Sequence, residues 1–270
     1  MTLSPPDAPL DDLRIERRDN GIAVVTLDLP ARRNMMSAPM TASWARLMAT
    51  LRTEADLRCV VVTGAGTAFC SGGDTSWIGS DPDAGVDALR TRMLAFYRAW
   101  LSVRDLEVPT IAAINGAAIG AGLALALACD LRYAAQDARI GVPFTSLGMH
   151  AGMATTWLLP EVAGLGVARE LLLTGRLVTG AEAATLGLVN RAFPGEALLE
   201  ETLGIAAEVA ATAPVAARLT KVALQGGGHA DVEAALQWEA LAQPVTLATD
   251  DLHEGIEASR ERRRPVFRGR

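Results

Sequence analysis

The sequence predicts an α/β fold with a helical C-terminal part, and three observations support this class. Short apolar segments typical of strands alternate with helical periodicity as far as Gly152. Beyond Gly152 the apolar spacing is helical. No Pro/Ser-rich linker, low-complexity stretch or internal repeat divides the 270 residues. A β/α core followed by helices is the simplest architecture that fits all three observations.

The first predicted elements are a hairpin, a helix and a third strand. Residues 14–18 and 22–29 flank Asp19-Asn20-Gly21, and an Asn-Gly pair between apolar segments is typical of a β-hairpin. Large apolar side chains then recur at helical spacing across residues 40–51. Residues 59–62 are β-branched or apolar and lead into a glycine-containing loop, as expected of a strand end.

An amphipathic helix and further strands follow. From Val86 one face carries Leu89, Met93, Phe96 and Trp100, and Pro109 ends the segment. Residues 131–134 and 139–142 have the pattern of short strands. The helices predicted after them span residues 154–159, 166–173, 181–186, 196–212, 215–224, 232–241 and 247–261.

Residues 111–129 (IAAINGAAIGAGLALALAC) form a run of nineteen residues without a charge. Length alone allows a membrane span. However, the run contains Asn115 and three glycines, and no basic or aromatic anchor flanks it. A buried strand at 110–114, a turn at 115–122 and a buried helix at 123–128 fit better. A membrane or structural protein built around this run remains as an alternative hypothesis.

Composition argues against several functional classes. Half of the residues are hydrophobic, which excludes a disordered chain. The chain has 31 acidic and 25 basic residues, so no basic surface for nucleic acid is expected. Cys59, Cys70 and Cys129 lie in apolar segments without a CxxC pair or a secretory leader, which favours reduced thiols in a cytoplasmic protein. The three histidines are scattered, so no metal site is expected.

Two glycine-containing loops are the candidates for a functional site. Residues 68–74 (AFCSGGD) contain adjacent glycines, which let the main chain approach a ligand closely. Residues 115–122 (NGAAIGAG) open into a helix, so their last N–H groups are unpaired and lie at the positive end of the helix dipole. Two such donors converging on one oxygen can stabilise an oxyanion or an enolate. Ordinary tight strand-to-helix turns would have the same sequence pattern.

Several motifs together resemble the enoyl-CoA hydratase/isomerase (crotonase) superfamily. The match covers nearly the whole chain in the family's order. The segments that carry it are LPARRNMM at 29–36, VVTG at 61–64, AFCSGGD at 68–74, residues 109–134, LLTGR at 172–176, AEAATLGLVN at 181–190, and Ala213-Pro214 with Lys221.

The resemblance implies the ClpP/crotonase-like α/β fold, with repeated ββα units in two nearly perpendicular sheets. Residues 1–194 would form this core, and residues 195–270 would form a helical region for contacts in a homotrimer or a dimer of trimers. Acyl-CoA and enoyl-CoA thioesters would be the substrates, as in the lyases and isomerases of fatty acid metabolism. Coenzyme A would enter as part of the substrate, and no tightly bound cofactor, nucleic acid or membrane partner is expected.

The resemblance also assigns site residues. The two N–H donors of the oxyanion hole would be Gly73 and Ala121, where alanine replaces the family's glycine but keeps the N–H. Arg32 and Arg33 would run beside the CoA nucleotide, although they could equally be plain surface arginines. Further substrate contacts would come from Ala68, Gly72 and Gly120 and from an apolar wall of Trp77, Phe144 and Met149, which as isolated apolar residues could also belong to the core.

The sequence departs from the hydratases at the catalytic carboxylates. The positions of the two hydratase glutamates are Ala124 and Phe144, and the family's alternative acid position is Gly152. None of these residues can carry a proton, so hydration of an enoyl-CoA cannot be assigned by motif.

The remaining candidates for proton transfer are His150 and Asp74. The ordinary pKa of His150 suits proton transfer near neutrality, but a loop histidine bonded to a backbone carbonyl is the alternative. Asp74 follows the Gly-Gly pair, where it could also cap neighbouring N–H groups. Two functional hypotheses therefore remain beside the membrane one. The first is an enzyme that forms a CoA enolate with His150, Asp74 or a bound water moving the proton, and the second is a non-catalytic acyl-CoA binder.

Overall fold

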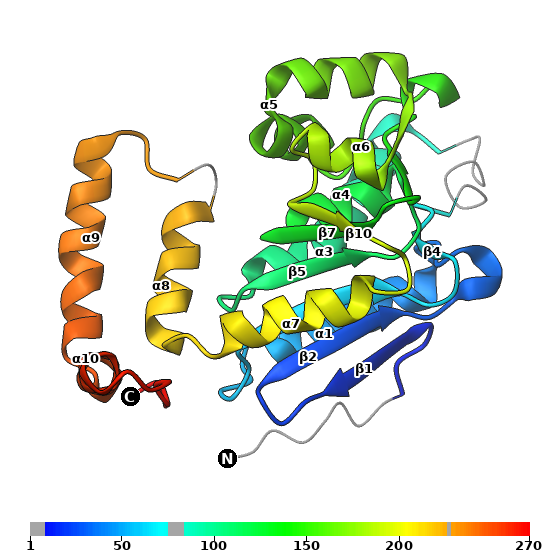
Figure 1. Cartoon of the computed structure of the whole chain (residues 1–270). Coiled ribbons are helices and arrows are strands. Elements are labelled where there is room, and N and C mark those ends of the chain that lie inside the picture. The colour runs from blue at the N-terminus through cyan, green and yellow to red at the C-terminus, as the bar shows by residue number, and fades with distance from the viewer. Residues whose placement is uncertain (1–8, 75–83, 226–227) are drawn as a thin grey trace.

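The computed structural model describes residues 9–74, 84–225 and 228–270, which adopt a mixed α/β fold (Figure 1). The described strands form two sheets. The larger sheet, in spatial order, contains β1 (Leu13–Arg17), β2 (Ile22–Leu27), β3 (Cys59–Gly64), β5 (Thr110–Ile114), β7 (Leu131–Ala135) and β10 (Arg191–Phe193). The smaller sheet contains β4 (Ala68–Cys70), β6 (Ala117–Ile119), β8 (Arg139–Gly141) and β9 (Leu177–Thr179). The α/β class predicted from the sequence is confirmed.

The pairing pattern follows from the order of the elements. Strands β1 and β2 form the predicted hairpin, with Leu13 opposite Leu27, and Gly21 adopts the positive φ of 78° that such a turn requires. The other pairings of the larger sheet are parallel, as expected of strands joined through helices. The central strands β3 and β5 are mainly apolar, and all their residues except Gly64 are buried, as expected of strands covered on both faces.

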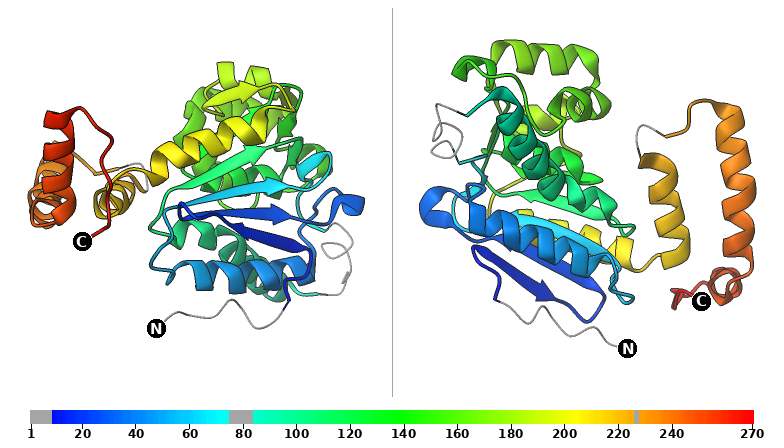
Figure 2. Two further views of the ribbon diagram at one scale, coloured as in Figure 1. Left: turned by 60° about the horizontal axis from the view of Figure 1, so that its bottom comes forward. Right: turned by 180° about the vertical axis from the view of Figure 1, so that it is seen from behind.

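Helices cover both faces of the larger sheet. Helices α1 (Ala38–Leu51) and α3 (Val86–Leu101) lie on one face, and α7 (Leu198–Ala210) crosses the other (Figure 2). Ser37 caps α1 by accepting a hydrogen bond from the Met40 N–H at 3.1 Å. Trp44 of α1 stacks on Trp100 of α3 with ring centroids 5.0 Å apart, which ties the two helices together.

The remaining helices lie around the smaller sheet and at the C-terminus. They are α4 (Ala121–Ala128), α5 (Thr155–Thr174), α6 (Gly180–Thr185), α8 (Pro214–Leu224), α9 (Val232–Leu247) and α10 (Asp250–Glu261). Helix α5 contains non-helical backbone at Gly164, with φ 78° and ψ 159°. The two helices predicted at 154–159 and 166–173 are therefore the two halves of α5.

Four strands correct the sequence-based assignment. Strand β4 lies where a loop was predicted, and β6 divides the predicted turn at 115–122, so that α4 begins at Ala121 instead of residue 123. Strands β9 and β10 interrupt the C-terminal half, which was predicted to be helical throughout. Each of these strands has three residues, too few to display an alternating pattern.

The uncharged run at 111–129 is divided among three elements of the fold. It forms most of β5, all of β6 and all of α4, and every residue of β5 and α4 is buried. The run therefore does not form one continuous helix, so the membrane span considered for residues 111–129 is wrong. Among the described helices, no single one is long and apolar enough to cross a membrane, although the pair α7 and α8, bent by 107°, passes by length and composition.

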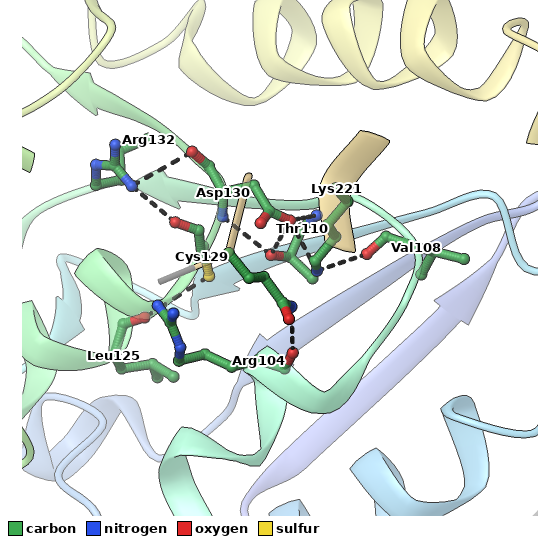
Figure 3. A network of polar contacts seen from close by, with 9 residues as sticks. Arg104, Val108, Thr110, Leu125, Cys129, Asp130, Arg132 and Lys221 are labelled. Carbon is green, nitrogen blue, oxygen red and sulfur yellow. Dashed lines mark hydrogen bonds and ion pairs between the residues drawn. The ribbon is translucent and has the colours of Figure 1, made fainter. Parts of the chain in front are cut away.

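The C-terminal helices α8, α9 and α10 project away from the two sheets (Figures 1 and 2). Lys221 of α8 makes one of the side-chain links from this projection to the core (Figure 3). Its Nζ lies 2.8 Å from the Asp130 carboxylate and donates to the Val108 carbonyl, also at 2.8 Å. The same carboxylate accepts from the Thr110 N–H and hydroxyl, so the two Lys221 contacts attach α8 to a carboxylate that is itself held in the core.

Candidate active site

The two predicted glycine loops leave the smaller sheet side by side. Strand β4 pairs in parallel with β6, so the segments that follow them emerge at the same edge. Gly72 adopts φ 101°, and a Cβ at this position would lie 2.8 Å from the Ile119 carbonyl oxygen and 3.6 Å from the Ala121 amide nitrogen. Only a residue without a side chain lets the first loop approach the second this closely.

The Gly73 and Ala121 N–H groups remain available as donors. Ala121 is the first residue of α4, so its N–H has no acceptor within the helix. Gly120 precedes it with φ 57° and ψ −116°, a conformation that turns the chain from β6 into the helix. Neither N–H donates a backbone hydrogen bond within the described residues. The positive end of the α4 dipole adds to the attraction of an anion at this position.

Both N–H groups border one cavity with a volume of about 130 Å³. The cavity lies between the two glycine loops, α3 and the segment that follows β8. Its lining is mainly apolar and consists of Ser71, Gly72, Gly73, Met93, Phe96, Tyr97, Ile119, Gly120, Ala121, Pro143, Phe144, Leu147, Met149, His150, Gly152 and Met153. An apolar site with a few polar groups is the usual form of a small-molecule pocket.

Seven of the predicted site residues meet in this cavity, namely Gly72, Gly73, Gly120, Ala121, Phe144, Met149 and His150. Trp77 lies outside the described residues. Asp74, Arg32, Arg33 and Ala68 do not line the cavity. Ala68 is buried in β4, where its carbonyl accepts a hydrogen bond from the Asn34 side chain at 2.7 Å.

The arginine segment lies against the first glycine loop. The Arg33 carbonyl accepts from the Ser71 N–H at 3.0 Å, and Arg33 itself has φ 51°. Arg32 is exposed, and its guanidinium lies 3.4 Å from the Asp74 carboxylate. Asp74 is thus paired with a cation beside the cavity, and Arg32 offers a positive charge at the same edge.

His150 borders the cavity from the loop before α5. Its Nδ1 lies 2.7 Å from the Ala151 carbonyl, and because a carbonyl can only accept, Nδ1 carries the proton. In the neutral ring Nε2 is then the unprotonated nitrogen. The two alternatives considered for His150, a bond to a backbone carbonyl and a place in the pocket, therefore hold together in this structure.

The three residues at the family's acid positions, Ala124, Phe144 and Gly152, have distinct surroundings. Ala124 is fully buried in α4, one turn after Ala121, and does not line the cavity. Phe144 lines the cavity, and its ring lies 3.5 Å from the position of a Cβ on Gly120. Gly152 also lines it. An aromatic ring thus forms the cavity wall at the position that corresponds to the second hydratase glutamate. No Asp or Glu lines the cavity within the described residues.

Sequence reasoning missed the contribution of α3. Met93 and Phe96 were predicted to lie on one face of an amphipathic helix; they are half-buried and line the cavity together with Tyr97. Of the four predicted face residues, only Trp100 is fully buried. The helical spacing of Met93 and Tyr97, four residues apart, could have indicated that both lie on the same side of α3.

The cysteines are not candidates for nucleophilic chemistry. Cys59, Cys70 and Cys129 are buried free thiols, as the sequence predicted. Burial raises the pKa of each to about 12, so the reactive thiolate is scarce near neutral pH. Among the described residues, the polar groups that line the cavity are therefore backbone N–H donors and the side chains of Ser71, Tyr97 and His150.

Comparison with known proteins gives consistent matches along the chain. The family profile described as enoyl-CoA hydratase/isomerase matches residues 17–270. The (E)-benzylidenesuccinyl-CoA hydratase of Thauera aromatica is 36% identical over 251 residues, covering 93% of this chain and 96% of that protein. The human mitochondrial enoyl-CoA hydratase domain-containing protein 2 is 34% identical over 257 residues, covering 93% of this chain and 87% of that protein.

A solved structure supports the same relationship in three dimensions. The crystal structure of enoyl-CoA hydratase from Bacillus anthracis superimposes with a TM-score of 0.90 at 32% identity. The match covers 96% of this chain and all of the other. The fold predicted from the motifs, with its two sheets and surrounding helices, is confirmed by this likeness.

Proposed function

The chain belongs to the enoyl-CoA hydratase/isomerase family, and from this premise we propose that it is an enzyme that stabilises a CoA-thioester enolate between the Gly73 and Ala121 N–H groups. The observation that carries the proposal is the pair of N–H groups that border one apolar cavity and donate no backbone hydrogen bond within the described residues. Two preorganised donors lower the energy of the enolate oxygen more than that of the neutral carbonyl. Loss of one donor would raise the barrier by about 3 kcal/mol.

The proton chemistry of the proposed enzyme differs from that of a hydratase with two glutamates. Ala124 and Phe144 stand at the expected carboxylate positions, so we do not assign water activation to a pair of acids. His150 is the proposed proton-transfer group, because its Nε2 is free to accept a proton. Asp74, whose carboxylate lies 3.4 Å from the Arg32 guanidinium, and a bound water are the other candidates.

Substrate recognition is proposed to divide between the cavity and its edge. The apolar cavity would take the acyl group, and the exposed guanidinium of Arg32 would face the CoA phosphates with Arg33 beside it. Coenzyme A enters as part of the substrate, and no resident cofactor is required for enolate formation.

A non-catalytic acyl-CoA binder is the second candidate function. The observation that favours it is the cavity lining, which includes no Asp or Glu within the described residues. Such a protein would hold the thioester carbonyl with the two N–H groups but would have no side chain close enough to accept a proton from the bound thioester.

We also propose that copies of the chain associate through the C-terminal helices, as a trimer or a dimer of trimers. Helix α9 buries none of its sixteen residues within the chain, and five of its large apolar side chains are exposed: Val232, Leu236, Leu241, Val245 and Leu247. Exposed apolar surface on this scale is typical of a contact surface.

A panel of CoA thioesters tests the proposed function. Crotonyl-CoA and longer enoyl-CoA and acyl-CoA esters would be incubated with the protein and analysed by mass spectrometry. We expect product from at least one ester. The Ala121→Pro variant removes the N–H at the first helical position, where proline is tolerated, and should lower turnover about 100-fold or more.

The matched control is Ala121→Gly, which keeps the N–H and should retain turnover. A His150→Ala variant with undiminished turnover would remove His150 from the mechanism. Tight thioester binding without product across the panel would select the non-catalytic binder instead.

A further inference from the structure

One polar side chain of the cavity has no hydrogen-bond partner among the described residues. Three lining side chains carry an O–H or N–H group, namely Ser71, Tyr97 and His150. The Ser71 hydroxyl donates to the Arg32 carbonyl at 3.4 Å, and His150 Nδ1 donates to the Ala151 carbonyl at 2.7 Å. The Tyr97 hydroxyl makes no hydrogen bond within the described part of the chain.

The position of the Tyr97 hydroxyl depends on a glycine across the cavity. A Cβ on Gly152 would lie 2.6 Å from the Tyr97 Oη and 3.1 Å from its Cζ. Any side chain at residue 152 would therefore push the ring end away. The phenol of Tyr97 occupies the space beside Gly152. Gly152 stands at the family's alternative acid position.

The surroundings favour Tyr97 as a hydrogen-bond donor. Met93 and Phe96 on α3 and Met153 across the cavity are its apolar co-lining residues. Burial raises the pKa of the phenol above its ordinary value, so it keeps its proton near neutral pH. A half-buried O–H without an acceptor is unfavourable, and a ligand oxygen placed beside it would remove this penalty.

We propose that Tyr97 is a specificity-determining residue, whose hydroxyl donates a hydrogen bond to an oxygen atom on the acyl chain of the bound thioester. This inference rests on the proposed function, because a CoA thioester is the occupant of the cavity. The thioester carbonyl is held by Gly73 and Ala121, so the Tyr97 hydroxyl selects among acyl chains by a separate contact. Acyl chains that carry an oxygen bind more tightly than chains of the same length without one.

Equilibrium binding of two ligands tests the inference. Butyryl-CoA and 3-hydroxybutyryl-CoA (both enantiomers) differ by one oxygen on the acyl chain, and their Kd values would be measured by calorimetry, corrected for any conversion seen by mass spectrometry. For the wild-type chain we expect at least one enantiomer to bind about 10-fold more tightly than butyryl-CoA. The Tyr97→Phe variant should reduce this ratio to about one.

Three further variants separate the Tyr97 hydroxyl from general effects on the fold. Gly152→Ala displaces the Tyr97 ring end and should reduce the ratio of the two Kd values without changing the phenol itself. Tyr133→Phe removes the hydroxyl of the chain's second tyrosine, which lies outside the cavity lining. Gly166→Ala adds a methyl group on α5 that would meet no described atom within 4 Å beyond the adjacent backbone of its own helix. Both of these controls should keep the wild-type ratio.

The outcomes distinguish this inference from the proposed function. Binding of both thioesters with equal ratios in the wild-type chain and in Tyr97→Phe would overturn the role of Tyr97 and leave the thioester site standing. Failure of the wild-type chain to bind either thioester would overturn the proposed function and this inference with it.

Discussion

Helices α4 and α9 are both rich in apolar residues but have opposite environments. All eight residues of α4 are buried between the two sheets and α5, whereas α9 buries none of its sixteen residues within the chain. Leu241 of α9 is 74% exposed. The difference shows that apolar composition alone does not decide where a helix lies. Helix α4 is fixed by contacts within the chain, whereas the exposed apolar surface of α9 is the one proposed above to contact other copies of the chain.

The tight packing of α4 predicts the largest loss of folding stability among the variants. A Cβ on Gly122 would lie 2.1 Å from the Cys70 carbonyl oxygen, which is backbone and cannot move aside easily. We expect Gly122→Ala to lower the free energy of unfolding by about 3 kcal/mol in urea denaturation, because overpacking a core forces backbone shifts. Gly204→Ala on α7, where a Cβ would meet no described atom within 4 Å beyond the adjacent backbone of its own helix, is the control and should change the free energy of unfolding by less than about 1 kcal/mol. If Gly122→Ala and Gly204→Ala changed the free energy of unfolding equally, the tight packing argued for α4 would be contradicted.

The Lys221 junction between α8 and the core predicts the next effect. The Lys221 side chain is 5% exposed, and Asp130 is 32% exposed. Lys221→Met removes the ion pair but leaves Asp130 with its Thr110 contacts, so we expect a loss of about 2 kcal/mol of unfolding free energy. Arg14→Met, which breaks an exposed pair with Asp28, should cost less than about 1 kcal/mol in the same assay. A junction that tolerates Lys221→Met as well as Arg14→Met would be held by packing instead.

The exposed face of α9 predicts an effect on association but not on folding. Burial of one leucine contributes about 1.5 kcal/mol or more, so Leu241→Ser should weaken association of copies about 10-fold per contact. Analytical ultracentrifugation over a concentration series would measure the change. Gln237→Ala on the same helix is the control and should associate as the wild-type chain does. Unchanged association in Leu241→Ser would place the contact surface elsewhere.

Helix α10 predicts the smallest effect, and it depends on pH. Hydrogen bonds from Arg263 and from the Val266 N–H lower the pKa of Glu254 to about 2. A lowered folded-state pKa contributes stability above the ordinary carboxyl pKa, and this contribution is lost as pH falls towards 2. The Tm of the wild-type chain should therefore fall more between pH 5 and pH 3 than the Tm of Glu254→Gln. Glu239→Gln on α9 should follow the wild-type curve, and a parallel curve for Glu254→Gln would contradict the prediction.

The sequence predicted the parts of the fold that repeat a pattern. The hairpin around Asp19-Asn20-Gly21 and the helical spacing of Trp44 and Leu51 carry local signals, and both elements are present. The three-residue strands β4, β6, β9 and β10 are stabilised by pairing with other strands of their sheets, so no local sequence pattern predicted them.

The site was predictable where a motif fixed the backbone and not where packing placed a side chain. Gly73 and Ala121 were found from glycine loops and family resemblance, and both border the cavity. Tyr97 was missed because its contribution depends on the meeting of α3 with Gly152, 55 residues further along the chain. Met93 and Phe96 have a spacing that fits a core face and a cavity wall equally well.

The carbonyl stretching frequency of a bound thioester tests the central claim most directly. Difference infrared spectroscopy of butyryl-CoA carrying ¹³C at the thioester carbonyl would compare the free ligand with the ligand bound to the wild-type chain. Two N–H donors at Gly73 and Ala121 polarise the carbonyl, so its stretching frequency should fall on binding and the shift should persist in Ala121→Gly. A bound thioester whose carbonyl frequency equals that of the free ligand would contradict the account.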